Sequence, residues 1–176
     1  AESIGAGVSR SGGQSEELHA TGVYKVTCIG ADGQVKWEDT IQNLVTTVGK
    51  NDLLDKYLAG SAYTAAWYLG LVDGGTTPTY AAGDTSASHS GWTENVAYSN
   101  STRPAPTWSA ASAGAKSTTA TAFNINGTAT IAGTFLISNS TKSGTTGILY
   151  SAGSFTGGNK SVSSGDTLNV TYTASV

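Results

Sequence analysis

Few residues in this sequence have the types and spacing that chemistry requires. The two histidines, His19 and His89, lie in different segments, whereas metal sites and acid–base pairs usually need tight clusters of histidine, cysteine and carboxylates. The tract Asp84, His89 and Ser90 contains the residue types of a hydrolase triad, but a triad is an arrangement in space on a rigid frame. We therefore expect a polar loop with a capping aspartate here, and predict no catalytic residue, no metal site and no cofactor.

The carboxylates offer no better pair. Glu38 and Asp39 are neighbours on a predicted strand, so their side chains should point to opposite faces. A glycosidase pair could come from distant residues such as Asp73 and Glu94, but nothing in the sequence favours that pair over chance. A glycan-cleaving enzyme is therefore the weakest of the functions considered, and we predict that the protein is not an enzyme.

The single cysteine, Cys28, cannot form an internal disulfide. It lies in an apolar run between Val26 and Ile29, which favours a buried small hydrophobic side chain over a nucleophile. The sequence contains no signal-peptide pattern and no long apolar stretch, and a start at Ala1 fits removal of an initiator methionine. We expect synthesis in the cytoplasm of a bacterial host and no membrane partner.

The composition is polar but poorly charged. Charged residues make up only 12% of the chain, and the formal net charge is −3. Lysine and arginine are scattered singly, so direct binding to nucleic acid is disfavoured, because neutralising phosphates needs a basic patch. Contacts with partners should come instead from shape, backbone hydrogen bonds and small-residue packing.

The first half of the chain predicts a hairpin and a helix. Tyr24, Val26 and Cys28 alternate with polar residues, as in a half-buried strand, and the turn signal 31–34 leads into a return strand over 35–41. The only good helix candidate covers 50–58, with Asn51 as its N-cap and Gly60 at its stop. Its apolar stripe comprises Leu53, Leu54, Tyr57 and Leu58.

The rest of the chain predicts short strands separated by turns. We expect a buried strand over 63–72, a long Gly/Thr/Ser loop over 73–91, a weaker strand over 92–98, and strands over 147–151 and 167–174. Asn126-Gly127 is the strongest short hairpin signal and should join 122–125 to 128–137. The predicted fold is mainly β: a jelly-roll-like antiparallel β-sandwich over residues 21–176, with one short helix.

Residues 1–20 form a polar segment without periodicity, which predicts an extended N-terminal arm. Ile4 and Val8, four residues apart, are its candidate apolar anchors. Together with Arg10 they are the predicted partner-binding residues of the arm.

The tryptophans are candidates for core packing and for subunit contacts. Trp67 lies in an apolar run and is predicted to be core. Trp92 and Trp108 flank a proline segment that begins after Arg103, and these three residues are the predicted oligomer or capsid interface. A platform that stacks on sugars is the alternative interpretation of the aromatic residues.

Four parts of the chain resemble small structural proteins of tailed phages, particularly the short-tailed ones. They are Trp67-Tyr68-Leu69-Gly70-Leu71-Val72-Asp73-Gly74; Asp84-Thr85 with His89-Ser90-Gly91-Trp92-Thr93-Glu94; Tyr98-Ser99 with Thr102-Arg103-Pro104; and Gly147-Ile148-Leu149-Tyr150 with Gly165-Asp166-Thr167-Leu168-Asn169-Val170-Thr171-Tyr172. The resemblance covers about two-thirds of the chain. It implies a virion protein, with jelly-roll cement (decoration) proteins as the closest analogue. Such proteins sit as dimers or trimers over joints between capsid subunits, and the family supplies no catalytic residues.

These expectations combine into one leading hypothesis. The protein is expected on the outer surface of a bacteriophage capsid, where it stabilises the head by bridging major capsid protein subunits. Its partners are then the major capsid protein and itself, as a dimer or trimer. The alternative is a tail-fibre or receptor-binding module that recognises host surface glycans.

Overall fold

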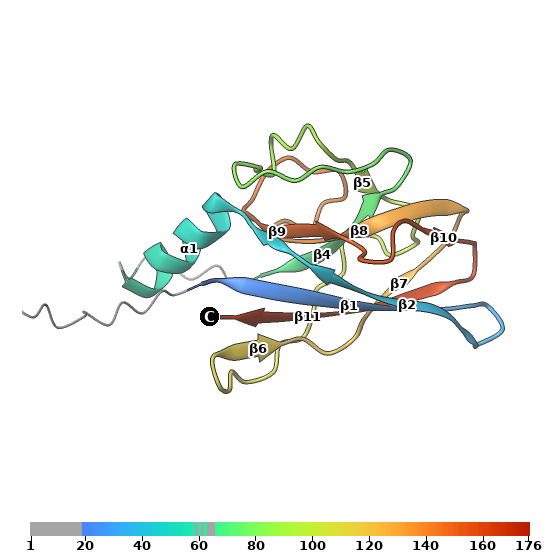
Figure 1. The fold of residues 1–176 in the computed structure, drawn as a ribbon, viewed down its shortest axis with the longest axis horizontal. Helices are drawn as coiled ribbons and strands as arrows, with labels where there is room; N and C mark the ends of the chain where they lie inside the picture. The colour runs from blue at the N-terminus through green and yellow to red at the C-terminus, as the bar shows by residue number, and fades with distance from the viewer. Residues whose placement is uncertain (1–18, 59, 61, 63–65) are drawn as a thin grey trace, which may run out of the picture.

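The computed structural model describes residues 19–58, 60, 62 and 66–176. Within them the fold is mainly β, with two antiparallel sheets and one helix (Figure 1). The elements are β1 (Thr21–Ile29), β2 (Val35–Gln42), β3 (Leu44–Val45), α1 (Thr47–Leu58), β4 (Tyr68–Asp73), β5 (Glu94–Asn95), β6 (Ala115–Ser117), β7 (Thr121–Asn124), β8 (Ala129–Ile137), β9 (Leu149–Ser154), β10 (Lys160–Val162) and β11 (Thr167–Ser175).

The first sheet has the order β2-β1-β11-β6, and β7 also pairs with β11. The alternation predicted for its long strands is confirmed, because Tyr24, Val26 and Cys28 of β1 are fully buried. The hairpin between β1 and β2 is also confirmed. Gly33 adopts a φ of 80° in its turn, a conformation that glycine reaches without strain.

The second sheet has the order β3-β9-β8-β4-β5, with β10 paired to β8. Its central strands are buried on both faces, since seven consecutive residues of β8 are buried. One face meets the first sheet. The predicted loop after β4 covers the other face, where Trp92 and Tyr80 pack against Phe135 and Val72.

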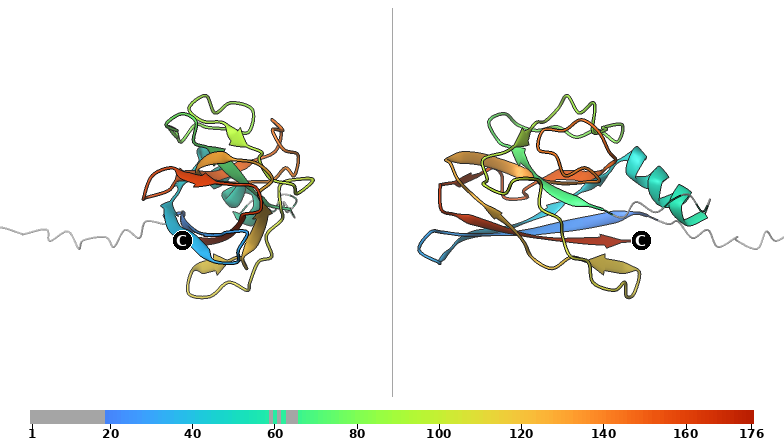
Figure 2. Two further views of the ribbon diagram at one scale, coloured as in Figure 1. Left: turned by 90° about the vertical axis from the view of Figure 1, so that its right-hand side faces the viewer. Right: turned by 180° about the vertical axis from the view of Figure 1, so that it is seen from behind.

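The main hydrophobic core lies between the two sheets. Tyr24 and Val170 from the first sheet belong to the same buried cluster as Leu69, Leu71 and Leu136 from the second. The end-on view in Figure 2 shows the two sheets wrapped around this interior. The predicted antiparallel β-sandwich with one helix is therefore present, whereas jelly-roll connectivity and the division at residue 20 stay predictions.

The predicted Asn126-Gly127 hairpin is wrong. The strand before it, β7, pairs with β11 in the first sheet, whereas the strand after it, β8, lies in the second. Gly127 is not among the glycines with positive φ, which the expected two-residue hairpin turn would require. This dipeptide instead lies where the chain crosses from one sheet to the other.

Two of the predicted strands are clearly shorter in the structure. The strand expected over 63–72 begins at Tyr68, and residues 63–65 lie outside the described part. The strand expected over 92–98 shortens to Glu94–Asn95, followed by an isolated bridge from Tyr98 to Ile125. Trp92 lies before this short strand, and its ring packs against the second sheet.

The turn between β10 and β11 is held by a buried carboxylate, that of Asp166. It accepts hydrogen bonds from Lys36 Nζ at 2.6 Å and from the backbone N–H of Ser163 at 2.9 Å. Burial alone would raise the pKa of Asp166, but these hydrogen bonds and the Lys36 charge outweigh it and lower the pKa below its usual value.

We therefore expect acid to weaken the fold through Asp166. A carboxyl whose pKa is lower in the folded state stabilises the fold above its unfolded-state pKa, about 4, and loses that contribution as the pH falls through the folded pKa. Asp166→Asn should melt below wild type near neutral pH, and the difference should shrink in strong acid. Circular-dichroism melts from about pH 7 to about pH 2 measure this. A constant difference across that range would contradict it.

Candidate functional site

The helix α1 is anchored to the second sheet at its first turn. Thr46 caps it, since its Oγ1 accepts the Gly49 N–H at 3.1 Å and donates to the carbonyl of Leu149. Gly49 is the one buried residue of the helix, and an added Cβ there would lie 2.6 Å from the carbonyl oxygen of Tyr150. The predicted N-cap, Asn51, is wrong and lies inside the helix. The predicted stop is confirmed, because Gly60 has a φ of 64°.

After the first turn, the apolar side chains of α1 are not buried in the hydrophobic core. Tyr57 is 86% exposed, Leu58 73% and Leu54 45%. The sequence places these residues on one stripe, as expected for an amphipathic helix, but the stripe does not merge with the core between the sheets.

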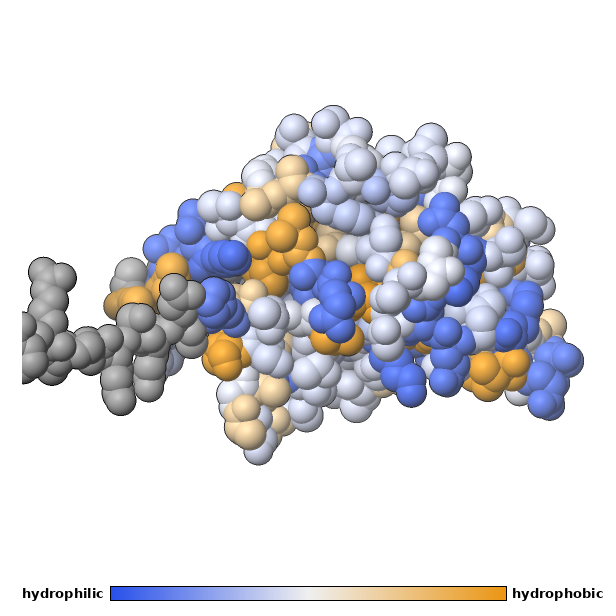
Figure 3. All heavy atoms as spheres, in the orientation of Figure 1, coloured by the Kyte–Doolittle hydropathy of each residue, from blue (hydrophilic) through white to orange (hydrophobic). Residues whose placement is uncertain are grey.

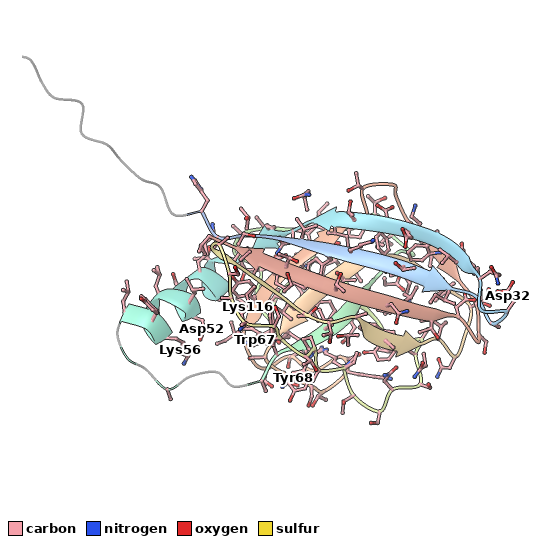
Figure 4. The ribbon with its side chains drawn as sticks, turned by 90° about the horizontal axis from the view of Figure 1, so that it is seen from below. Asp32, Asp52, Lys56, Trp67, Tyr68 and Lys116 are labelled. Carbon is pink, nitrogen blue, oxygen red and sulfur yellow. The ribbon has the colours of Figure 1, made fainter. Side chains whose placement is uncertain are left out.

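The stripe instead forms one wall of an open groove of about 710 Å³ between α1 and the ends of both sheets. Figure 4 shows Asp52 and Lys56 of α1 beside Trp67 and Lys116, at the end of the molecule opposite Asp32. The groove is lined by Asp52, Leu53, Leu54, Lys56, Tyr57, Leu58, Trp67, Trp108, Lys116, Leu136, Tyr150, Tyr172, Ala174 and Val176.

Aromatic rings make the floor of this groove. Trp67 meets Tyr150 edge to face at 5.6 Å between ring centroids, and Trp108 meets Tyr172 edge to face at 6.1 Å. Burial raises the pKa of both tyrosines, so their phenols stay neutral at physiological pH. The floor therefore offers mainly stacking and apolar contact, because Tyr150 and Tyr172 are both buried and the Tyr172 hydroxyl accepts a hydrogen bond from Asn43 Nδ2.

The charged residues at the rim are already engaged. Lys56 lies 3.7 Å from Asp52 one turn earlier on α1, and Lys116 donates to the carbonyl of Ser109 at 2.8 Å. These contacts place no nucleophile next to a base and bring no two carboxylates together in the groove. An exposed apolar concavity rich in tryptophan and tyrosine is typical of a binding surface.

Much of the surface outside the groove is weakly polar. In the face drawn in Figure 3, most of the surface is pale, because serine, threonine and glycine dominate it. Strongly hydrophilic residues gather near α1 and towards the β1–β2 hairpin. The lining of the groove, by contrast, consists mainly of leucine, tryptophan, tyrosine, alanine and valine.

A smaller cavity of about 270 Å³ lies beside a buried ion pair. Arg103 donates from Nε and Nη2 to the two carboxylate oxygens of Glu94, at 2.9 and 2.8 Å, and also to the carbonyl of Asn139 at 3.0 Å. The backbone N–H of Ser143 donates to Glu94 as well. This cluster fastens the segments around residues 94–103 and 139–144 to each other.

Two predicted interface residues are therefore interior residues in this conformation. Arg103 is 3% exposed and spends its donors on Glu94 and backbone carbonyls, while Trp92 is 4% exposed. Trp92 Nε1 donates to Asp84 at 3.1 Å, and its ring packs against Phe135. The prediction that these two side chains form an outer interface is wrong for the subunit described. The ring contact of Trp92 with Phe135 and the two hydrogen bonds from Arg103 to Glu94 instead stabilise the subunit itself.

Trp108 is the predicted interface residue that reaches the groove. Trp67, predicted as core, is only partly buried and lines the groove as well. Ile4, Val8 and Arg10 lie outside the described residues. Sequence reasoning missed Tyr150, Tyr172 and Val176 as groove residues. The helix stripe was the available signal, because a stripe of exposed leucine and tyrosine needs a partner surface.

The sequence motifs that suggested chemistry do not assemble. Asp84 accepts from Trp92, and His89 stacks on the same indole at 4.1 Å. Asp73 accepts a hydrogen bond from Asn95 Nδ2 at 2.6 Å. Cys28 is fully buried, and burial together with the Asp166 charge raises the pKa of its thiol to about 11.

No group of three or more histidine, cysteine or carboxylate side chains in the described part of the chain could hold a metal ion. The same part contains no helix with the length and apolarity needed to cross a membrane. Comparison with protein-family models and with curated proteins finds no match.

Proposed function

We propose that this protein is a structural protein of a tailed-phage particle, a cement protein on the outer surface of the capsid that bridges major capsid protein subunits. The observation that carries the proposal is the open apolar groove beside α1, with Tyr57 and Leu58 exposed at its wall. In this proposal the groove serves association between proteins, and the chain carries out no reaction.

The character of the groove supports association. Tryptophan and tyrosine are enriched at protein interfaces, and they dominate binding energy where a partner encloses them. Here the indoles of Trp67 and Trp108 and the phenol of Tyr57 surround one concavity. The titratable chemistry elsewhere is used internally, as in the pair of Glu94 with Arg103.

The residues that resemble tailed-phage structural proteins include the ones that shape this architecture. The segment Trp67–Gly74 supplies a groove residue and then β4, in the centre of the second sheet. The segment Asp84–Glu94 includes Trp92, which covers that sheet. The closing segment ends at Tyr172 on the groove floor. Trp67, Tyr150 and Tyr172 of the groove therefore lie in segments that carry the resemblance, whereas α1 and Trp108 lie outside them.

Shells that lack this protein provide the test. We expect the full chain to bind empty expanded capsids saturably, in amounts comparable with the capsid protein. A variant without residues 1–18 should stay folded but lose about tenfold or more in retention, because the arm adds a tethered contact to each bound copy. Co-sedimentation followed by quantitative gel analysis measures both, and circular dichroism checks the fold of the truncated chain.

If the truncated chain is retained on shells as well as wild type is, the arm does not contribute to binding. If the full chain does not bind shells at all, the proposal is wrong. Val35→Ser is a matched control, since Val35 is an exposed apolar residue at the start of β2, away from the groove. It should bind shells as wild type does.

A glycan-binding module is the second candidate, and one observation favours it. The aromatic rings of Trp67 and Trp108 lie near the polar side chains of Asp52 and Lys116, a combination that can stack on and hydrogen-bond to sugars. A glycan-array scan of the purified protein distinguishes the two. Glycan binding lost in Trp108→Ala, together with no binding to shells, would favour the tail module.

A further inference from the structure

The sequence contains one Asn-Gly step, at Asn126-Gly127, and the fold leaves its reacting groups free. The asparagine side chain is exposed. Within the described residues, neither its amide nor the backbone N–H of Gly127 makes a hydrogen bond. The space around Gly127 is open, since a Cβ added there would meet no atom within 4 Å. The Gly127 nitrogen can therefore approach the side-chain carbonyl carbon of Asn126 without breaking an interaction of the fold.

Two other asparagines that precede a small residue, serine in both cases, are held in place. Asn100 donates to the carbonyl of Ala122 at 3.2 Å, and its side-chain oxygen accepts the backbone N–H of Asn124 at 3.0 Å. Asn139 is held in the same way, by two side-chain hydrogen bonds within its own loop. Attack on either side chain must first break two hydrogen bonds, whereas Asn126 has none to break.

We propose that Asn126-Gly127 is a site of spontaneous modification, at which the asparagine deamidates through a cyclic imide. The Gly127 nitrogen gives its proton to solvent and forms a bond to Cγ of Asn126, while the bond from Cγ to the side-chain nitrogen breaks and ammonia leaves. Glycine favours this attack because it has no side chain to crowd the nitrogen. Water then opens the ring. The whole reaction consumes one water, releases one ammonia and oxidises nothing.

The ring can open at either of its carbonyl carbons, and the two products differ in their main chain. Opening at Cγ gives aspartate, which adds a negative charge and leaves the main chain as it was. Opening at the former backbone carbonyl gives isoaspartate, whose main chain runs through Cβ and Cγ and is therefore one carbon longer.

The position of this step gives the longer chain a structural effect. Asn126 lies in the crossover from β7 to β8, and the chain at its start is fixed by hydrogen bonds. The Ile125 N–H donates to the carbonyl of Asp166 at 2.8 Å, and the Asn126 N–H donates to that of Ala97 at 3.3 Å. Only residues 127 and 128 separate Asn126 from β8. We expect isoaspartate to strain this short connection and aspartate to leave it intact.

Peptide mapping by mass spectrometry tests the site, using the full chain aged in mildly alkaline buffer with and without urea. Asn126 should convert in the folded chain at a rate within about threefold of its rate in urea, because no structure has to open first. Asn100 and Asn139 should react at least about tenfold more slowly in the folded chain than in urea, since each needs a local opening. Comparing each asparagine with itself removes the intrinsic difference between glycine and serine as the next residue.

Two variants check the chemistry and its effect on the fold. Gly127→Ala should slow the reaction at Asn126 roughly tenfold in both conditions, because the new Cβ crowds the attacking nitrogen. Aged wild type should contain a fraction that unfolds at lower urea than fresh protein does. Freshly prepared Asn126→Asp should lack that fraction, because it carries the same charge on an unaltered main chain.

If Asn126 stays an amide in the folded chain while it reacts in urea, the proposal is wrong. Protection of Asn126 equal to that of Asn139 would overturn it as well. Aged wild type that has converted at Asn126 but unfolds in one transition at the midpoint of fresh protein would refute the expected strain in the crossover.

Discussion

Replacing Gly133 with alanine should lower the free energy of unfolding by about 4 kcal/mol or more. Gly133 lies in β8 opposite Ser154 of β9, and a Cβ there would overlap the carbonyl oxygen of Gly153. The clash is with backbone rather than with the end of a flexible side chain. Because β8 is paired with β4 on one side and β9 on the other, neither strand can move away without breaking a ladder. Since domains of this kind have about 5 to 15 kcal/mol in total, a loss of this size removes between roughly a quarter and most of the free energy of unfolding.

Chemical denaturation followed by tryptophan fluorescence measures this loss. Gly127→Ala is the control, since a Cβ at Gly127 meets nothing and φ there is not positive. Its free energy of unfolding should stay within about 0.5 kcal/mol of wild type. Equal stability of Gly133→Ala and Gly127→Ala would mean that β8 and β9 are not packed as described.

Replacing Arg103 with methionine should cost about 3 to 5 kcal/mol. The guanidinium supplies two hydrogen bonds to Glu94 and one to the carbonyl of Asn139, and both side chains of the ion pair are almost completely enclosed. Methionine fills similar space but leaves the Glu94 carboxylate buried without its cation. The penalty is therefore mainly that of an uncompensated buried charge.

The double variant Glu94→Leu with Arg103→Met should recover part of this loss, because it removes the stranded charge as well. Thermal and urea unfolding give the free energies of unfolding of wild type, the two single variants and the double variant, which together form a double-mutant cycle. Lys25→Met, at an exposed position in β1, is the matched control and should change stability by less than about 0.5 kcal/mol. A loss at Arg103 no larger than that at Lys25 would show that the ion pair contributes nothing.

The regular strands were predictable because burial repeats every second residue along them. Tyr24, Val26 and Cys28 in β1 and Leu168, Val170 and Tyr172 in β11 alternate inward in the sequence and are all fully buried. These two strands pair along their whole length, with Thr21 opposite Ser175 and Ile29 opposite Thr167.

Of the two predicted hairpin turns, one is confirmed and one is wrong, and the local sequence does not distinguish between them. The signal at Asp32-Gly33 closes a hairpin, but Asn126-Gly127 connects two different sheets. Each turn dipeptide is compatible with a reversal. The pairing of β7 with β11, more than 40 residues away, decides the second case. Such long-range pairings are invisible to a reading of neighbouring residues.

Part of the candidate site could be predicted from the sequence. The spacing of Leu54, Tyr57 and Leu58 gave the stripe on α1, and Trp108 was named as a contact residue. Tyr172 belongs to a distant strand and reaches the floor only because β11 runs beside β1 at this end of the sheet. Trp92 was misplaced because an aromatic residue suits an interface and a core equally well.

The sequence by itself determined that this protein is mainly β, that residues near 50–58 form a short amphipathic helix, and that its single cysteine is buried, because these follow from local periodicity and side-chain polarity. Only the tertiary structure decided which apolar residues stay uncovered. Burial depends on which surfaces the chain brings together, and here the anchor of Gly49 on Tyr150 fixes the start of α1 while leaving its later turns beside an open groove.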